Sequence, residues 1–187
     1  MTGEPMERRN KGLLFQNRVL IALGLICGWL AGGVVVFAYD GGAEEGPSTE
    51  LPVFLYFVDP AHPYLTAEQR PGMEAEASVE FCRLLVESLI RGPSGGLART
   101  IPPEAVLRAV FLEGKTAYVD FSREISDSHP GGIVSELMTV YSIVNTLVLN
   151  IDGVDQVKLL IEGRDADTLA GHIDIRSPLS ADMMIIR

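Results

Sequence analysis

The sequence is poor in the side chains that most enzymes use for catalysis. It holds three histidines (His62, His129 and His172) and two cysteines among 187 residues. It contains no G-x-S-x-G turn for a nucleophilic serine. The glycine-rich stretch at 92–96 lacks the lysine that a phosphate-binding loop needs. These shortages disfavour the common serine hydrolases and the nucleotide-binding enzymes.

The two cysteines lie far apart in different kinds of sequence. Cys27 stands inside an uncharged apolar run, and Cys82 stands in a segment with helical periodicity. Two isolated thiols build neither a disulfide framework nor a zinc site. We therefore predict no disulfide and no metal site, and no residue pattern in the chain requires a cofactor.

Acidic residues cluster around a turn near the end of the chain and need a separate test. Asp152, Asp155 and Glu162 do not have the alternating oxygen spacing of a calcium loop, and strand-like residues separate them from Asp165 and Asp167. Asp152-Gly153 is typical of a tight turn, because glycine accepts a positive φ. We predict a structural turn here and not a metal loop.

Basic residues are scarce outside the first 39 positions. Residues 1–39 carry a net charge of +2, whereas residues 40–187 hold 11 basic and 23 acidic side chains, a net charge of −12. An acidic domain repels the phosphate backbone of nucleic acids. We therefore exclude nucleic acid as a partner.

Charge is entirely absent from residues 19–39, an apolar run of 21 residues. About 20 apolar residues span the hydrocarbon core of a bilayer as a helix. Basic residues precede the run and acidic residues follow it, so the positive-inside rule places residues 1–18 in the cytoplasm as a tail and residues 40–187 outside. The sequence thus predicts a single-pass protein of the cytoplasmic membrane with an extracytoplasmic (periplasmic or cell-surface) domain.

Two other interpretations of this segment stay open. Val36-Phe37-Ala38 fits a signal-peptidase site loosely, although the apolar run is longer than the usual core of a signal peptide. A lipid anchor on Cys27 would require a small residue directly before the cysteine. The residue there is the larger Ile26, which disfavours a lipid anchor. Residues 40–50 are rich in glycine and acidic residues and predict a flexible linker.

The outer part of the chain alternates strand-like and helix-like segments. Residues 65–72 read as the approach to the first helix, and residues 181–187 as a C-terminal tail. Periodicity predicts strands at 51–58, 157–161 and 171–175, a hairpin at 106–121, and helices at 74–91 and 133–149. The order β-α-β-β-α-β-β predicts an α/β domain of the α+β type, with two helices packed on one face of a small mixed sheet.

Short motifs across residues 51–180 resemble the GerMN domain family of sporulation and germination proteins, in single copy. The motifs are Leu55-Tyr56-Phe57, Leu65 with Arg70, Leu89 to Pro93, Ile101-Pro102, Gly114 with Ala117 to Ser122, Ile143 to Leu147, Gly153-Val154 with Val157, Gly163, Gly171-His172, and Pro178-Leu179. The family-motif residues singled out as structural are Arg70, Gly92, Pro93, Asp120, Ser122, Asn145, Thr146, Leu147, Gly153, Val154, Gly163, Gly171 and His172.

The resemblance implies a domain outside the cytoplasm that is not established as an enzyme. A similar α/β arrangement occurs in ring-building motifs of sporulation complexes, so the resemblance also implies assembly or partner binding. The chain departs from the family in its expected helical anchor, where GerM-type proteins are often lipoproteins. The domain also occurs in bacteria that form no spores, so the family name does not fix the biology.

We therefore expect a non-enzymatic envelope protein that binds other envelope proteins or itself. An alternative is a module for peptidoglycan or a small ligand, using Tyr56, Tyr64 and Tyr118 as stacking platforms. A third is a hydrolase that uses His129 or His172 with a nearby acid. For the interaction surface we predict loop 123–132 and the outer side of helix 74–91, including Arg83 and Glu87.

Overall fold

The structure is a computed structural model that describes residues 52–72 and 79–187. The predicted membrane span at 19–39 and the linker at 40–50 lie outside the described residues. Seven regular elements carry the fold, together with two short helices. They are β1 (Val53–Val58), β2 (Leu65–Arg70), α1 (Val79–Arg91), β3 (Leu107–Glu113), β4 (Thr116–Phe121), α2 (Glu124–Asp127), α3 (Ile133–Asn150), β5 (Gln156–Ile161) and the 3-10 helix η1 (Met183–Ile185).

The strands form two sheets. β1 and β2 pair antiparallel, while the second sheet has the order β3-β4-β5, with β3 and β4 antiparallel and β4 and β5 parallel. The mixed α+β class is confirmed. The prediction of one sheet is wrong, because residues 65–70 do not lead into a helix but form β2 and pair with β1.

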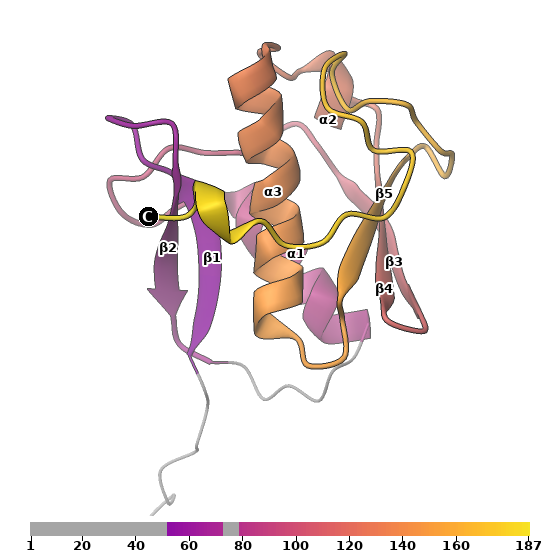
Figure 1. Cartoon of the computed structure of the whole chain (residues 1–187), viewed down its shortest axis with the longest axis horizontal. Helices are drawn as coiled ribbons and strands as arrows, with labels where there is room; N and C mark the ends of the chain where they lie inside the picture. The colour runs from indigo at the N-terminus through magenta and orange to yellow at the C-terminus, as the bar shows by residue number, and fades with distance from the viewer. Residues whose placement is uncertain (1–51, 73–78) are drawn as a thin grey trace, which may run out of the picture. The chain divides into compact units, whose positions relative to one another are not determined.

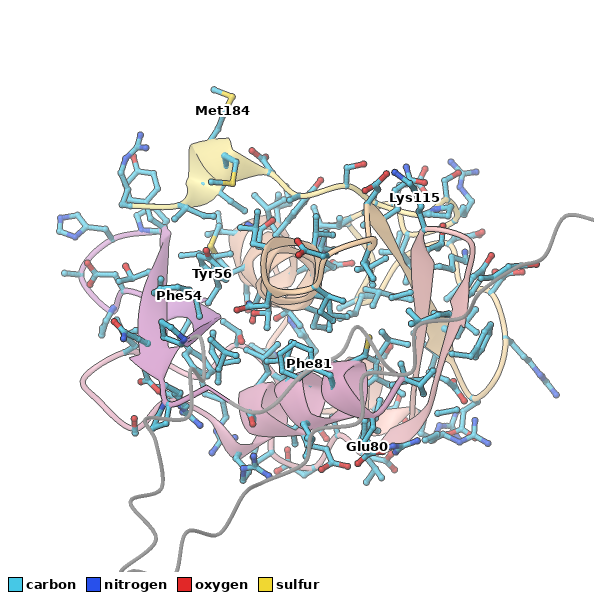
Figure 2. The ribbon with its side chains drawn as sticks, turned by 90° about the horizontal axis from the view of Figure 1, so that it is seen from below. Phe54, Tyr56, Glu80, Phe81, Lys115 and Met184 are labelled. Atoms are coloured by element: carbon cyan, nitrogen blue, oxygen red, sulfur yellow. The ribbon has the colours of Figure 1, made fainter. Side chains whose placement is uncertain are left out.

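Helix α3 lies between the two sheets, and Figure 2 shows it end-on with the β1-β2 sheet on one side and the β3-β4-β5 sheet on the other. It contacts β1 and β5, whereas α1 packs against β1, β3 and α3. The two helices therefore do not share one face of a single sheet. Figure 1 shows how α3 occupies the middle of the domain, where it joins the two sheets.

The middle of α3 is buried, whereas its first turn is exposed. Val140, Ile143 and Leu147 are fully buried, whereas Ile133 at the helix start is 62% exposed. α3 is also long and apolar enough to cross a membrane, but 56% of it is buried within the fold. Packing between two sheets accounts for this composition, since a core helix is apolar on most sides.

The end of the chain differs from the predicted strand at 171–175. That segment contributes a single bridge between Thr168 and Asp174. The last residues return to the first sheet, where Ile186 bridges to Leu65 and the backbone N–H of Arg187 donates to the carbonyl of Leu65 at 2.9 Å. Ile186 and Arg187 thus lie against β2 of the first sheet.

Candidate functional site

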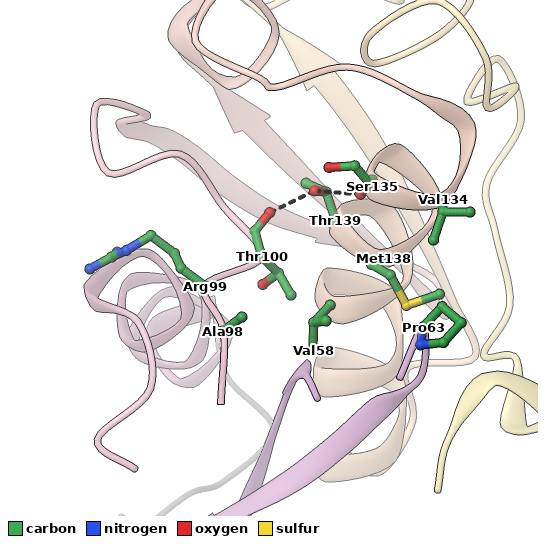
Figure 3. Close-up of a pocket in the computed structure, with 9 residues that line it drawn as sticks. All are labelled: Val58, Pro63, Ala98, Arg99, Thr100, Val134, Ser135, Met138 and Thr139. Carbon is green, nitrogen blue, oxygen red and sulfur yellow. Dashed lines mark hydrogen bonds between the residues drawn. The ribbon is translucent and has the colours of Figure 1, made fainter. Parts of the chain in front are cut away.

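An apolar cleft opens where α3 begins, and it has a volume of about 370 Å³. Figure 3 shows that its walls come from the end of β1, the loop between β1 and β2, the segment at 98–100 and the first turns of α3. The lining residues are Val58, Pro63, Ala98, Arg99, Thr100, Val134, Ser135, Met138 and Thr139. Apolar walls with a few polar groups are typical of a binding pocket.

Hydrogen bonds fix the walls of the cleft. Val58 and Ala98 form a bridge with two backbone bonds of 3.2 and 2.7 Å. The Thr139 hydroxyl donates to the carbonyl of Thr100 at 2.6 Å, which ties α3 to the same segment. The cleft is therefore held by a bridge on one side and by a helix side chain on the other.

Exposed apolar residues extend the cleft onto the surface. Ile133 is 62% exposed and Val134 is 53% exposed, at the first turn of α3. Gly132 precedes them without a side-chain cap for the helix. Neighbouring exposed aliphatic side chains beside an apolar hollow are a common mark of a protein interaction site.

His129 lies next to this region and has a structural hydrogen-bond pattern. The backbone N–H of Gly131 donates to His129 Nδ1 at 3.0 Å, so Nδ1 carries no proton. His129 Nε2 then donates to the Thr139 hydroxyl at 2.9 Å, and that hydroxyl in turn donates to Thr100. Burial lowers the pKa of His129, and the nearby Glu136 carboxylate opposes this only in part.

Glu136 is the most completely enclosed charged group of the described residues. Its side chain is fully buried and accepts hydrogen bonds from four backbone N–H groups and one imidazole nitrogen. The donors are Leu169 (3.0 Å), Ala170 (2.7 Å), His172 (2.9 Å), Ile173 (3.1 Å) and His172 Nδ1 (3.0 Å). Burial by itself raises the pKa of Glu136, but these donors outweigh it and the pKa lies below its usual value.

The Glu136–His172 pair resembles the acid and base of a hydrolase. A hydrolase of this kind would also need a nucleophilic hydroxyl or thiol next to the histidine. Within residues 52–72 and 79–187, no hydroxyl or thiol hydrogen-bonds to the His172 ring. The hydroxyl that meets His129 is that of Thr139, which already donates to a backbone carbonyl. His62 contacts Asp59 in an exposed turn. The histidines therefore organise loops, and their contacts assemble no nucleophile.

The acidic residues around the turn at 152–153 are dispersed. Asp155 pairs with Lys115 at 2.9 Å, and Asp165 pairs with the buried Lys158 at 2.9 Å. Gly153 has φ 90°, which explains the glycine in the turn. Among the residues that the structure describes, no group of three histidine, cysteine or acidic side chains could hold a metal ion.

Two neighbouring family-motif residues on α3 bind backbone from distant segments. Asn145 donates from its amide nitrogen to the carbonyl of Asp182 at 3.0 Å and accepts from the N–H of Asp182 at 2.9 Å. The Thr146 hydroxyl accepts from the backbone N–H of Tyr56 at 3.2 Å. Leu147, the third residue of the triplet, is fully buried in the core.

Other family-motif residues meet in pairs. Arg70 donates to the carbonyl of Gly92 at 2.8 Å. The backbone N–H of Gly163 donates to the carboxylate of Asp120 at 2.7 Å. Ser122 exchanges two hydrogen bonds with the backbone of Val106.

The remaining family-motif residues lie at turns. Gly171, with φ 105°, donates to the Thr168 hydroxyl at 2.9 Å immediately before His172. Val154 is buried directly after the turn at Gly153. Pro93 follows Gly92, which ends α1 with φ 89°. The structure thus distributes these residues over the seams of the domain and gathers them into no single pocket.

The predicted interaction surface is only partly accessible. Arg83 and Glu87 are half-buried, and Arg83 lies 3.9 Å from Glu80. Within loop 123–132 the structure places the short helix α2, whose Ile125 is fully buried. The more apolar surface comes directly after this loop, at Ile133 and Val134.

The three tyrosines considered for glycan stacking do not form one platform. Tyr56 is buried, and Tyr64 lies under the Arg187 guanidinium at 4.8 Å. Tyr118 stacks on Phe111 in the other sheet, with ring centroids 4.6 Å apart. Each ring is therefore engaged by a different neighbour.

Sequence reasoning did not identify Glu136 or the cleft. Glu136 occupies the same helical face as Val140, Ile143 and Leu147, so its place in the periodic pattern signals a buried carboxylate. The cleft joins β1, the loop at 63, the segment at 98–100 and α3. Such a site depends on tertiary packing and has no local sequence pattern.

Comparisons with known proteins agree on the fold. The family model Germane, described as "Sporulation and spore germination", matches residues 54–167. The first GerMN domain of the sporulation protein GerM from Bacillus subtilis is 24% identical, with a TM-score of 0.54, over 71% of this chain and 96% of that domain. No curated protein sequence matches the chain.

Two further solved structures have the same fold. The tandem GerMN domains of Bacillus subtilis GerM are 24% identical with a TM-score of 0.54, and the match covers 71% of this chain but 45% of the tandem structure. A candidate lipoprotein from Clostridium perfringens is 21% identical with a TM-score of 0.52, over 70% of this chain and 85% of that one. The described residues therefore share their fold with single GerMN domains.

Proposed function

Because the chain belongs to the Germane family of sporulation and spore germination domains, we propose that it is a non-enzymatic, membrane-anchored protein of the cell envelope. Its domain acts on the extracytoplasmic side and assembles envelope complexes through protein–protein contacts. The observation that carries this proposal is the apolar cleft beside the exposed Ile133 and Val134.

The chemistry of the cleft favours a protein partner. Val58, Pro63 and Met138 supply apolar surface. The polar groups of Arg99, Thr100 and Thr139 in the lining already have hydrogen-bond partners within the domain. A pocket of this kind rewards burial of one aliphatic or aromatic side chain and offers few polar groups to a sugar. The occupant we propose is an apolar side chain of another envelope protein.

The proposed location follows from the predicted span at 19–39 and from the relatives. One structural relative is a candidate lipoprotein, and another is a sporulation protein. A single-pass helix with its N-terminus inside would hold residues 40–187 outside the cytoplasm. This placement leaves the cleft accessible to membrane and wall-associated proteins.

In-cell photo-crosslinking of the full-length tagged protein tests the proposal. A photoreactive residue at Val134 should give crosslinks to one or a few envelope proteins, identified by mass spectrometry. The matched control is Val106, which is 57% exposed but lies outside the cleft. The variant Val134→Asp, with no photoreactive residue in the cleft, should lose partner recovery under chemical crosslinking, because Val134 is 53% exposed and its substitution leaves the core intact.

Three results would count against the proposal. Equal crosslinking from both positions would remove the cleft as a specific site. Recovery of peptidoglycan fragments without protein would favour the glycan-binding alternative. A hydrolytic activity that is measurable in the wild-type protein and lost in His172→Ala would support the hydrolase alternative.

A further inference from the structure

The outer edge of β3 differs from the other sheet edges. Strands β1, β2, β3 and β5 lie at the edges of the two sheets. The edges of β1, β2 and β5 have partners. On β1, Val58 bridges Ala98, and on β2, Leu65 bridges Ile186. On β5, Val157 bridges Leu179 and Ile161 bridges Arg164. In the described part of the chain, no strand or bridge pairs with the outer edge of β3.

The hairpin geometry shows which backbone groups point outward from this edge. Glu113 pairs with Thr116 across Gly114-Lys115, and Gly114 has φ 58°. A two-residue turn makes its flanking residues a hydrogen-bonded pair, and the pattern then alternates along the strands. Phe111 therefore bonds to β4, whereas the N–H and C=O groups of Val110 and Leu112 point away from the sheet.

An aromatic side chain marks the same edge. Phe111 is 43% exposed and stacks on Tyr118, with ring centroids 4.6 Å apart and an interplanar angle of 10°. One face of the Phe111 ring is covered by Tyr118 of β4. The other face points beyond the edge of the sheet, because β3 is the outermost strand. The Tyr118 hydroxyl donates to Glu113 at 3.1 Å, which holds the aromatic pair in place.

We propose that a second copy of this chain adds to the edge of β3. The two β3 strands pair antiparallel about a two-fold axis at Phe111, and they form a continuous six-stranded sheet. The inference deepens the proposed function, since self-association is one form of the envelope assembly described above. It specifies a surface that is separate from the cleft at α3.

The side chains favour this register. Val110 lies opposite Leu112 of the second copy on the inner face, and the two Phe111 rings meet on the outer face as a cross-strand pair. Glu113 lies opposite the small side chain of Ala109 of the second copy, while Arg108 keeps its ion pairs with Asp120 at 3.4 Å and Glu162 at 3.6 Å within its own copy. Centring the axis on Val110 would instead place Arg108 opposite Leu112 and include the irregular register between Leu107 and Ala109.

Cysteine crosslinking of the full-length protein in native membranes tests the register. In a Cys27→Ser background, Phe111→Cys should form a disulfide-linked dimer on mild oxidation, because directly opposite residues lie about 4.5 Å apart at Cα. Glu113→Cys is the matched control on the same strand and face. Its two copies would lie four residue steps apart, about 13 Å, and should not crosslink.

A second measurement tests association without a new cysteine. Phe111→Lys should weaken dimerisation in detergent by about tenfold or more, measured by light scattering across a concentration series. Phe54→Lys is the control, because Phe54 is a 38% exposed phenylalanine on β1 of the other sheet. It should leave the association unchanged.

Several outcomes would overturn the inference. They are a monomeric wild-type protein at all concentrations, crosslinking of Glu113→Cys in preference to Phe111→Cys, or equal effects of the two lysine variants. Retained Val134 crosslinks to other proteins, together with a monomer, would reject the β3 dimer while leaving the proposed function intact. Loss of both would reject the proposed function as well.

Discussion

The side-chain amide of Asn150 pairs with the backbone of Phe54 in the manner of a neighbouring strand. It accepts from the Phe54 N–H at 2.8 Å and donates to the Phe54 carbonyl at 2.7 Å. Thr146, one helical turn earlier, accepts from Tyr56 N–H. Helix α3 thus satisfies the edge of β1 with side chains, which protects that edge from pairing with another chain.

Asn145→Ala should release the C-terminal segment from α3. The substitution removes both hydrogen bonds to Asp182, and we expect a loss of about 1–2 kcal/mol in the free energy of unfolding. Hydrogen exchange of the Asp182 and Met184 amides should become faster, while exchange in β1 stays slow. The control Asn150→Ala should show the reverse, with faster exchange at Phe54. Equal exchange patterns in the two variants would contradict the assignment of each amide to its own segment.

Gly92→Ala should destabilise the domain. Gly92 has φ 89°, and a Cβ atom would come within 2.8 Å of the Arg99 guanidinium carbon. Backbone strain and displacement of Arg99 together should cost about 1–3 kcal/mol, measured by urea unfolding. Gly96→Ala is the matched control, because nothing lies within 4 Å of its Cβ position and its φ is not positive. Similar midpoints for the two variants would rule out this role of Gly92.

Local patterns in the sequence predict the hairpin at 106–121, both main helices and the strand at 157–161. These elements have clear periodicity, and the resemblance to the GerMN family correctly identifies their fold. β2 is missed because Ala67, Glu68 and Gln69 have no strand preference. Its pairing with β1 depends on tertiary contacts that local preferences do not encode.

The candidate site is less predictable for the same reason. The Asn145–Asp182 and Gly163–Asp120 contacts join segments that are far apart in the sequence. A sequence motif can identify such residues, but it does not show which distant residues they hydrogen-bond to. Glu136 is also missed, although its helical register with Val140 and Leu147 is a local signal of a buried carboxylate.

Glu136→Gln should weaken the loop at 169–173. The amide keeps the size of the side chain, but its NH₂ group faces either the His172 donors or the backbone donors of Leu169, Ala170 and Ile173. We expect a loss of about 2–3 kcal/mol in unfolding free energy, because hydrogen bonds to a charged acceptor are lost. His172→Ala, which removes one side-chain donor, should cost about 1 kcal/mol. A larger loss in His172→Ala than in Glu136→Gln would show that the imidazole is the principal support of the loop.

Acidification should destabilise the domain in two separate ranges. The folded-state pKa of His129 is lowered, so the folded protein binds fewer protons than the unfolded chain and stability falls as the pH drops below about 6.5. The pKa of Glu136 is also lowered, so its contribution is present above about 4.5 and is lost only as the pH falls through its folded-state value.

His129→Gln isolates the first of these ranges. The variant cannot be protonated at this position, so the stability advantage of the wild-type protein should shrink between pH 7.5 and pH 5, measured by urea unfolding of the full-length protein followed by circular dichroism. Protonation at Nδ1 breaks the hydrogen bond from Gly131, which leads directly into α3 beside the cleft. Parallel stability curves for wild type and variant over this range would mean that His129 does not titrate with folding. A difference that instead grows toward pH 5 would show that the folded state favours the imidazolium, contrary to the neutral tautomer inferred from the Gly131 contact.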